Sequence, residues 1–96
     1  MTSSGEASRT SEFIHDRDLG WIADCNAMVA EVTQASLGVG YEIAKGVNLG
    51  KRVLCLYRPQ EGKRLSAMIA GCRDVTNVEY QNLEEAKRAI DGFFLK

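Results

Sequence analysis

Arg52–Tyr57, RVLCLY, is the stretch that decides the fold class of this 96-residue sequence. A nearly continuous apolar run of this length is typical of a parallel strand that is covered on both faces. Residues 27–32 (AMVAEV) predict a second short buried strand, and residues 75–80 predict a third, weaker one. The turn-rich segment 58–63 (RPQEGK) ends the central strand.

Helical patterns lie before, between and after these strands, which gives the order α-β-α-β-α-β-α. Strands that alternate with helices are parallel and joined by right-handed crossovers, so we expect one α/β domain over residues 11–96. The loop 33–40 (TQASLGVG) should precede the second helix, and Asn82 with Glu85 resembles a capping box before the last. The helices are expected to start near Ser11, Tyr41, Leu65 and Leu83; the first should bury Ile14, Trp21, Ile22 and Cys25, and the last Leu83, Ala86, Ile90 and Phe93 or Phe94.

The composition is that of an ordinary globular chain, with 45% hydrophobic and 26% charged residues. Its net charge of -1 provides no electrostatic basis for binding a nucleic acid polymer or a membrane surface. No apolar run approaches transmembrane length. Residues 1–10 (MTSSGEASRT) are polar, so we expect a disordered tail and not a signal peptide.

The three cysteines, Cys25, Cys55 and Cys72, fall in apolar stretches, where a thiol usually behaves as a small hydrophobic side chain. Their odd number disfavours a disulfide framework, and the absence of a Cys-x-x-Cys pair disfavours a zinc site. We therefore expect no metal or other cofactor. A reducing compartment, the cytoplasm or the nucleus, fits free thiols best.

Two carboxylates stand out. Asp18 lies on the apolar face of the first helix, where a charge is costly unless it has a partner or a role. Glu42 follows a loop that contains Gly38 and Gly40 and comes after the carboxyl end of a predicted strand. Ligands of open α/β sheets bind at that end of the strands. The free N–H groups at a helix start there suit a phosphate. Simpler explanations are a solvent-exposed Asp18 and a Glu42 that complements the helix dipole. The loop is no dinucleotide fingerprint, because Ile43 stands where a third glycine is expected.

Residues 30–42 (AEVTQASLGVGYE) resemble the active-site segment of the 2'-deoxynucleoside 5'-phosphate N-hydrolases, relatives of the nucleoside 2-deoxyribosyltransferases. Residues 13–21 (FIHDRDLGW), 51–60 (KRVLCLYRPQ) and 65–69 (LSAMI) resemble further segments of that family, in the same order and spacing. Several runs in register are far more specific than one short motif. The resemblance implies hydrolysis of the N-glycosidic bond of 2'-deoxynucleoside 5'-monophosphates, which releases the free base and 2-deoxyribose 5-phosphate.

The resemblance also implies roles for individual residues. Glu42 matches the catalytic nucleophile of the family, and Asp18 matches the second carboxylate, which contacts the deoxyribose and assists proton transfer. This chemistry needs no metal, because a carboxylate beneath the anomeric carbon can form a covalent glycosyl-enzyme that water then hydrolyses.

Substrate-binding residues follow in the same way. Ser36 matches a phosphate-binding serine, and Gly38 and Gly40 match the glycines of that loop. Ser66 matches a serine that reaches the 5'-phosphate from the neighbouring subunit, which implies a homodimer with shared sites. Taken alone, Ser66 could equally be a surface hydroxyl at a helix start. Phosphate-binding serines also argue against deoxyribosyl transfer, which handles nucleosides.

The family fold is Rossmann- or flavodoxin-like, with five parallel strands in the order 2-1-3-4-5. Nothing before Ser11 resembles its opening strand, loop, helix and second strand, so we expect a sheet of about three strands with residues 27–32 at an exposed edge. The alternative to an active hydrolase is a catalytically incomplete relative that acts as a dimerising or interaction module. Retention of both Asp18 and Glu42 favours the hydrolase.

Overall fold

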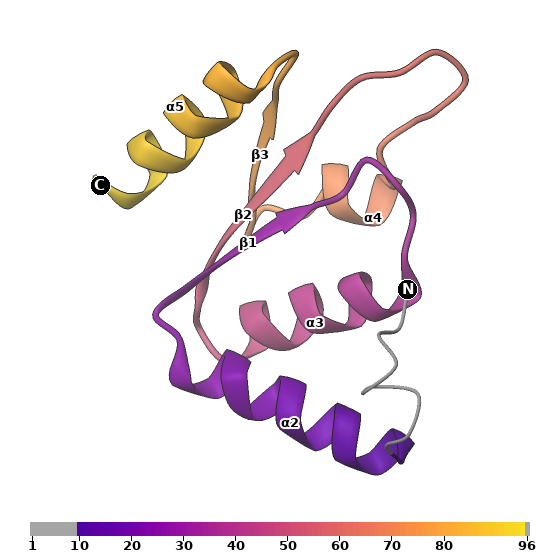
Figure 1. Ribbon diagram of the computed structural model, residues 1–96, viewed down its shortest axis with the longest axis vertical. Helices are drawn as coiled ribbons and strands as arrows, with labels where there is room; N and C mark the ends of the chain where they lie inside the picture. The colour runs from indigo at the N-terminus through magenta and orange to yellow at the C-terminus, as the bar shows by residue number, and fades with distance from the viewer. Residues whose placement is uncertain (1–9, 96) are drawn as a thin grey trace.

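The computed structural model describes residues 10–95 as an α/β structure on a three-stranded parallel sheet (Figure 1). The tail expected at residues 1–10 lies outside the described residues except for Thr10. No helix in the described part is long and apolar enough to cross a membrane. In chain order the elements are α2 (Ser11–Asp24), β1 (Ala27–Glu31), α3 (Leu37–Asn48), β2 (Arg52–Tyr57), α4 (Ala67–Ala70), β3 (Thr76–Glu79) and α5 (Leu83–Phe94).

The strand order is β1-β2-β3, and both pairings are parallel. Ala27 of β1 lies opposite Arg52 of β2, and Leu54 of β2 lies opposite Thr76 of β3. This confirms two predictions: β2 is the central strand, and residues 27–31 form an edge strand among the described residues. Val29 of that edge is 41% exposed, as expected for an apolar strand with one open side.

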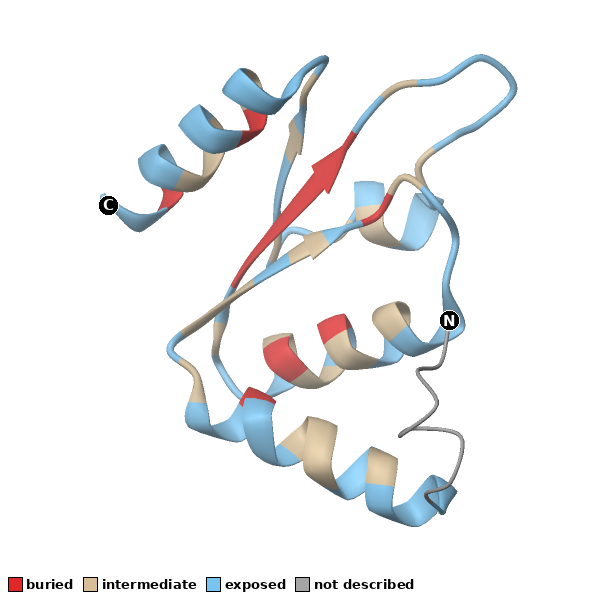
Figure 2. Cartoon of the chain, in the orientation of Figure 1, coloured by how far each residue is buried: buried red, intermediate tan, exposed pale blue. Residues whose placement is uncertain are grey.

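Successive side chains of β2 point into two separate cores, one on each face of the sheet. Val53, Cys55 and Tyr57 pack on the face covered by α3 and α4, while Leu54 and Leu56 pack against α5 (Figure 1). All five are buried (Figure 2). The other two strands of the described chain have no such run of buried residues. A continuous apolar run is therefore required here, because neither face of β2 meets water.

Two helices differ from their predicted bounds. α3 begins at Leu37, four residues earlier than expected, because Ser36 is its N-cap and its Oγ accepts a hydrogen bond from the N–H of Val39 at 3.2 Å. Gly38 and Gly40 are thus helical and not loop residues. The helix expected at 65–72 is a single turn, α4.

The helix caps account for the other starts. Thr10 caps α2 by accepting from the N–H of Phe13 at 3.0 Å, and Asn82 caps α5 by accepting from Glu85, as predicted. Two residues expected in the core are exposed, Trp21 (62%) and Leu83 (69%), whereas Phe93 is buried, as expected of either Phe93 or Phe94. α2 has Ile22 as its one buried residue, since it packs beside α3 and not on the sheet.

Candidate active site

α2 and α3 lie side by side (Figure 1), and this contact brings Asp18 of α2 near Glu42 of α3. The carboxyl of Asp18 lies close enough to that of Glu42 to affect its ionisation. Burial raises the pKa of Glu42 above its ordinary value, and the proximity and negative charge of Asp18 raise it further. Two carboxyls that share a site in this way can share one proton, which lets one act as an acid and the other as a base or nucleophile.

Arg17 lies directly beside this pair. Its Nε and Nη2 donate to Oδ1 of Asp18 at 3.0 and 2.9 Å. The guanidinium also stacks on two aromatic rings of the same helix, 4.6 Å from the centroid of Trp21 and 5.9 Å from that of Phe13. The cation offsets part of the negative charge that two adjacent carboxyls concentrate here.

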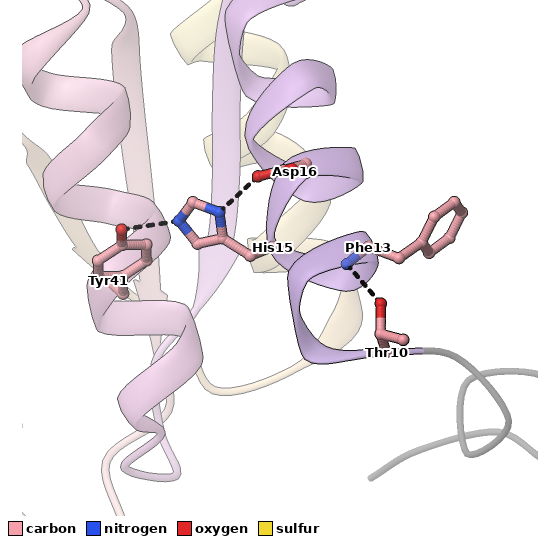
Figure 3. Close-up of polar contacts among 5 residues, drawn as sticks. All are labelled: Thr10, Phe13, His15, Asp16 and Tyr41. Atoms are coloured by element: carbon pink, nitrogen blue, oxygen red, sulfur yellow. Dashed lines mark hydrogen bonds and ion pairs between the residues drawn. The ribbon is translucent and has the colours of Figure 1, made fainter.

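One turn before Asp18, His15 joins α2 to α3 (Figure 3). Its Nε2 lies 2.9 Å from the hydroxyl of Tyr41, and its Nδ1 lies 3.0 Å from Oδ1 of Asp16. The rings of His15 and Tyr41 are tilted against each other, with centroids 5.5 Å apart. This contact was not predicted, although His15 lies in the segment FIHDRDLGW that carries the family resemblance.

The position of Glu42 in α3 corrects one sequence expectation. Glu42 lies in the second turn and not at the start of the helix, so the helix dipole, which acts mainly within the first turn, does little for its charge. Gly38 lies four residues earlier on the same side, about 6 Å along the axis. A Cβ at Gly38 would meet only Oγ of Ser36, at 4.0 Å, so the surface from the helix start to Glu42 is open.

The opposite side of α3 forms a cavity of about 770 Å³ with α4. Ser36, Gly40 and Ser66 line it, whereas Asp18 and Glu42 do not. The structure therefore brings the two expected phosphate-binding serines of one chain to the same cavity, next to the carboxyl pair and not within it. Most of the remaining lining is apolar and includes Val39, Ile43, Ala44, Met68 and Ile69.

A polar cluster at the carboxyl end of the sheet was also missed from the sequence. The hydroxyl of Tyr80 donates to Oε2 of Glu31 at 2.8 Å, and the N–H of Thr33 donates to Oε1 at 3.0 Å. The Thr33 hydroxyl donates to Glu31 and accepts from the N–H of Arg58 at 2.9 Å. Burial alone would raise the pKa of Glu31, but hydrogen bonds from Thr33 and Tyr80 outweigh it and hold that pKa below its ordinary value.

This cluster ties together the ends of all three strands. Glu31 ends β1, Arg58 follows β2 and Tyr80 follows β3. The segment that leads to Ser36 is thereby anchored to the rest of the sheet. The sequence did contain a signal for this cluster: Glu31 ends an apolar strand, and Thr33 follows two residues later. A carboxylate in such a place needs hydrogen-bond partners.

Comparison with solved structures defines the class of fold. The chain superposes on the Clostridium botulinum CMP N-glycosidase BcmB with a TM-score of 0.73, over 83% of this chain and 73% of that one. The two sequences are 21% identical, so the likeness establishes the fold alone. No family model matches the chain.

Sequence relatives define the family. The chain is 46% identical over 97 residues to a 5-hydroxymethyl-dUMP N-hydrolase of Tetraodon nigroviridis, which covers 98% of this chain and 68% of the relative. It is also 58% identical over 91 residues to the Mus musculus 5-hydroxymethyl-dUMP N-hydrolase, of which it covers 53%. The chain belongs to this family of 2'-deoxynucleoside 5'-phosphate N-hydrolases. It spans about half the length of the mouse protein and of the Homo sapiens relative, of which it covers 52%.

Proposed function

We propose that this chain carries the catalytic carboxyls of a hydrolase that cleaves the N-glycosidic bond of 2'-deoxynucleoside 5'-monophosphates. The observation that supports this most is that Asp18 of α2 lies beside Glu42 of α3 and raises its pKa, next to an open helix surface. The names of the relatives, 5-hydroxymethyl-dUMP N-hydrolases, indicate the class of substrate. The products would be the free base and 2-deoxyribose 5-phosphate.

The proposed reaction uses the pair in two steps. The carboxylate of Glu42 bonds to the anomeric carbon while the bond to the base breaks, and Asp18 supplies the proton that the departing base needs. Water then attacks the anomeric carbon, releases Glu42 and returns a proton to the pair. The raised pKa of Glu42 fits a pair that shares one proton. Whenever that proton is on Asp18, Glu42 is ionised and can act as the nucleophile.

The 5'-phosphate would bind at the start of α3. The first N–H groups of a helix have no partner within the helix and favour an anion. Ser36 adds a hydroxyl at that end, and Gly38 leaves room for the sugar between the phosphate and Glu42. Gly40 and Ser66 would contribute to phosphate binding from the side of the cavity between α3 and α4.

A homodimer would complete this site. Leu37 and Met68 are 97% and 84% exposed and line the apolar cavity between α3 and α4 that also contains Ser66. Association through this face would bury both side chains and carry Ser66 toward the Ser36 segment of the partner. Sedimentation should therefore show a dimer, and Leu37→Glu should shift it to monomer.

We further propose a reducing compartment, the cytoplasm or the nucleus. Cys25, Cys55 and Cys72 are free thiols. Burial, with a smaller contribution from Cys72, raises the pKa of Cys55, which keeps this core thiol protonated and unreactive. Fluorescence microscopy of the tagged chain would test the location.

The activity is tested by chromatographic detection of free base and 2-deoxyribose 5-phosphate from 5-hydroxymethyl-dUMP and other deoxynucleoside monophosphates. We expect release from the nucleotides and much slower release from the matching nucleosides, since only the nucleotides carry the phosphate. Equal rates for nucleotides and nucleosides would contradict phosphate binding at the start of α3. A dimer that releases no base would favour the alternative, a dimerising interaction module.

A further inference from the structure

We propose that His15 is a positioning residue: its hydrogen bond to Tyr41 holds α2 at the distance from α3 that keeps Asp18 against Glu42. This inference rests on the proposed function for its catalytic meaning, but the geometry that it describes can be measured without turnover. Nothing in the sequence separates His15 from its polar neighbours in α2. The structure does, because its imidazole bridges the two helices (Figure 3).

α2 needs such a tether because little apolar packing holds it. Ile22, in the second half of α2, is its one buried residue among those described. Phe13 and Trp21 are 45% and 62% exposed. At the far end, Lys51 donates to the carbonyl of Ala23 at 3.0 Å. The turn that carries Asp18 lies between that anchored end and the His15 contact.

The carboxyl pair itself works against close approach. Two carboxyls in contact repel when both are ionised, so the helices that carry them separate unless other contacts hold them. His15 and Asp18 lie one turn apart on one face of α2, and Tyr41 and Glu42 are consecutive in the backbone of α3. A bond between His15 and Tyr41 therefore limits how far the turns that carry Asp18 and Glu42 can separate.

Both partners of the bond are themselves fixed. Asp16 lies 3.0 Å from Nδ1 of His15, which orients the ring so that Nε2 meets the Tyr41 hydroxyl at 2.9 Å. The Nζ of Lys45 lies 6.0 Å from the centroid of the Tyr41 ring. The imidazole of His15 thus has an acid near one nitrogen and a phenol near the other, and it links the two helices.

The test measures the Glu42 titration midpoint by carboxyl carbon NMR in the intact chain. Asp18→Asn sets the reference for a Glu42 without its acidic partner, with a midpoint shifted down toward an ordinary glutamate. His15→Ala and Tyr41→Phe should each shift the midpoint part of the way to that reference. The double variant should shift it no further than either single variant, because both remove the same hydrogen bond. His15→Gln, which keeps an amide that can reach the phenol, should restore part of the shift.

Glu12→Gln, an exposed change in the first turn of α2, is the matched control and should leave the midpoint unchanged. Circular dichroism identifies variants that lose helix content, and Tyr41→Phe keeps the ring packing if His15→Ala unfolds. In the turnover assay, the tether variants should lower kcat about tenfold or more with little change in KM, because misplaced catalytic groups lose rate and not affinity. An unchanged midpoint in folded Tyr41→Phe would overturn the proposal, whether or not the chain releases base.

Discussion

The two sides of α3 differ in chemical character. The side toward α2 carries Glu42 against Asp18, two acids whose charges repel. The side toward α4 is an apolar cavity in which Ser36 and Ser66 are among the few polar side chains. One helix thus has an acidic polar contact on one side and an exposed apolar surface on the other.

Under the proposed function, this difference marks where the fold gives up stability for chemistry. Two adjacent carboxyls cost free energy when both are ionised, and a large apolar hollow costs free energy unless something fills it. The first side fits a reaction centre, and the second fits a surface that another chain or a ligand covers. Substitutions on the two sides should therefore affect different quantities.

The largest expected effect is on the acidic side. Glu42→Ala should lower the rate of base release on the order of a thousandfold or more, because it removes the nucleophile of a covalent step. Chromatographic turnover measurements on folded protein test this. The nucleophile assignment would be wrong if the variant kept near-normal turnover.

Asp18→Asn should come next, with a loss of about a hundredfold or more in kcat, since a general acid contributes on that scale. Asparagine keeps the shape of the side chain and removes its proton, so KM should change little. The same chromatographic measurements on folded protein test this. A near-normal kcat would contradict the role given to Asp18.

A change at the start of α3 tests the link between the two sides. Ser36→Ala should raise KM for deoxynucleotides and, by removing the N-cap bond to Val39, lower the free energy of unfolding by about 1 kcal/mol. Ser66→Ala is the matched control, because Ser66 makes no side-chain cap bond in α4. Thermal melts should separate the two serines; equal destabilisation would contradict the cap.

The smallest expected effect concerns stability and pH. Because the folded pKa of Glu42 is raised, its contribution to stability is fully present below the unfolded value of about 4.5 and is lost as pH rises through the folded pKa. Glu42→Gln, which cannot ionise, should therefore be more stable than the parent chain at neutral pH, by about 0.5 kcal/mol for a partly solvated pair. Denaturant unfolding at pH 4 and pH 7 should show this gain only at pH 7.

Much of the fold could be predicted from the sequence because local patterns carry it. The run at 52–57 matches β2 residue for residue, and Asn82 caps α5 as expected. The start of α3 was misplaced because two glycines suggested a loop, while the capping hydroxyl of Ser36 begins the helix before them. Trp21 and Leu83 were misjudged because a helical apolar pattern does not say whether a neighbour covers it.

The sequence by itself determined the alternation of strands and helices, the central place of β2 and, through family resemblance, the identity of the candidate site residues. Only the tertiary structure decided which of them meet. Asp18 with Glu42, His15 with Tyr41 and Glu31 with Tyr80 each join residues from different elements. The physical reason is that periodicity fixes the face of a helix on which a residue lies, whereas the partner of that face depends on how separate elements pack against one another.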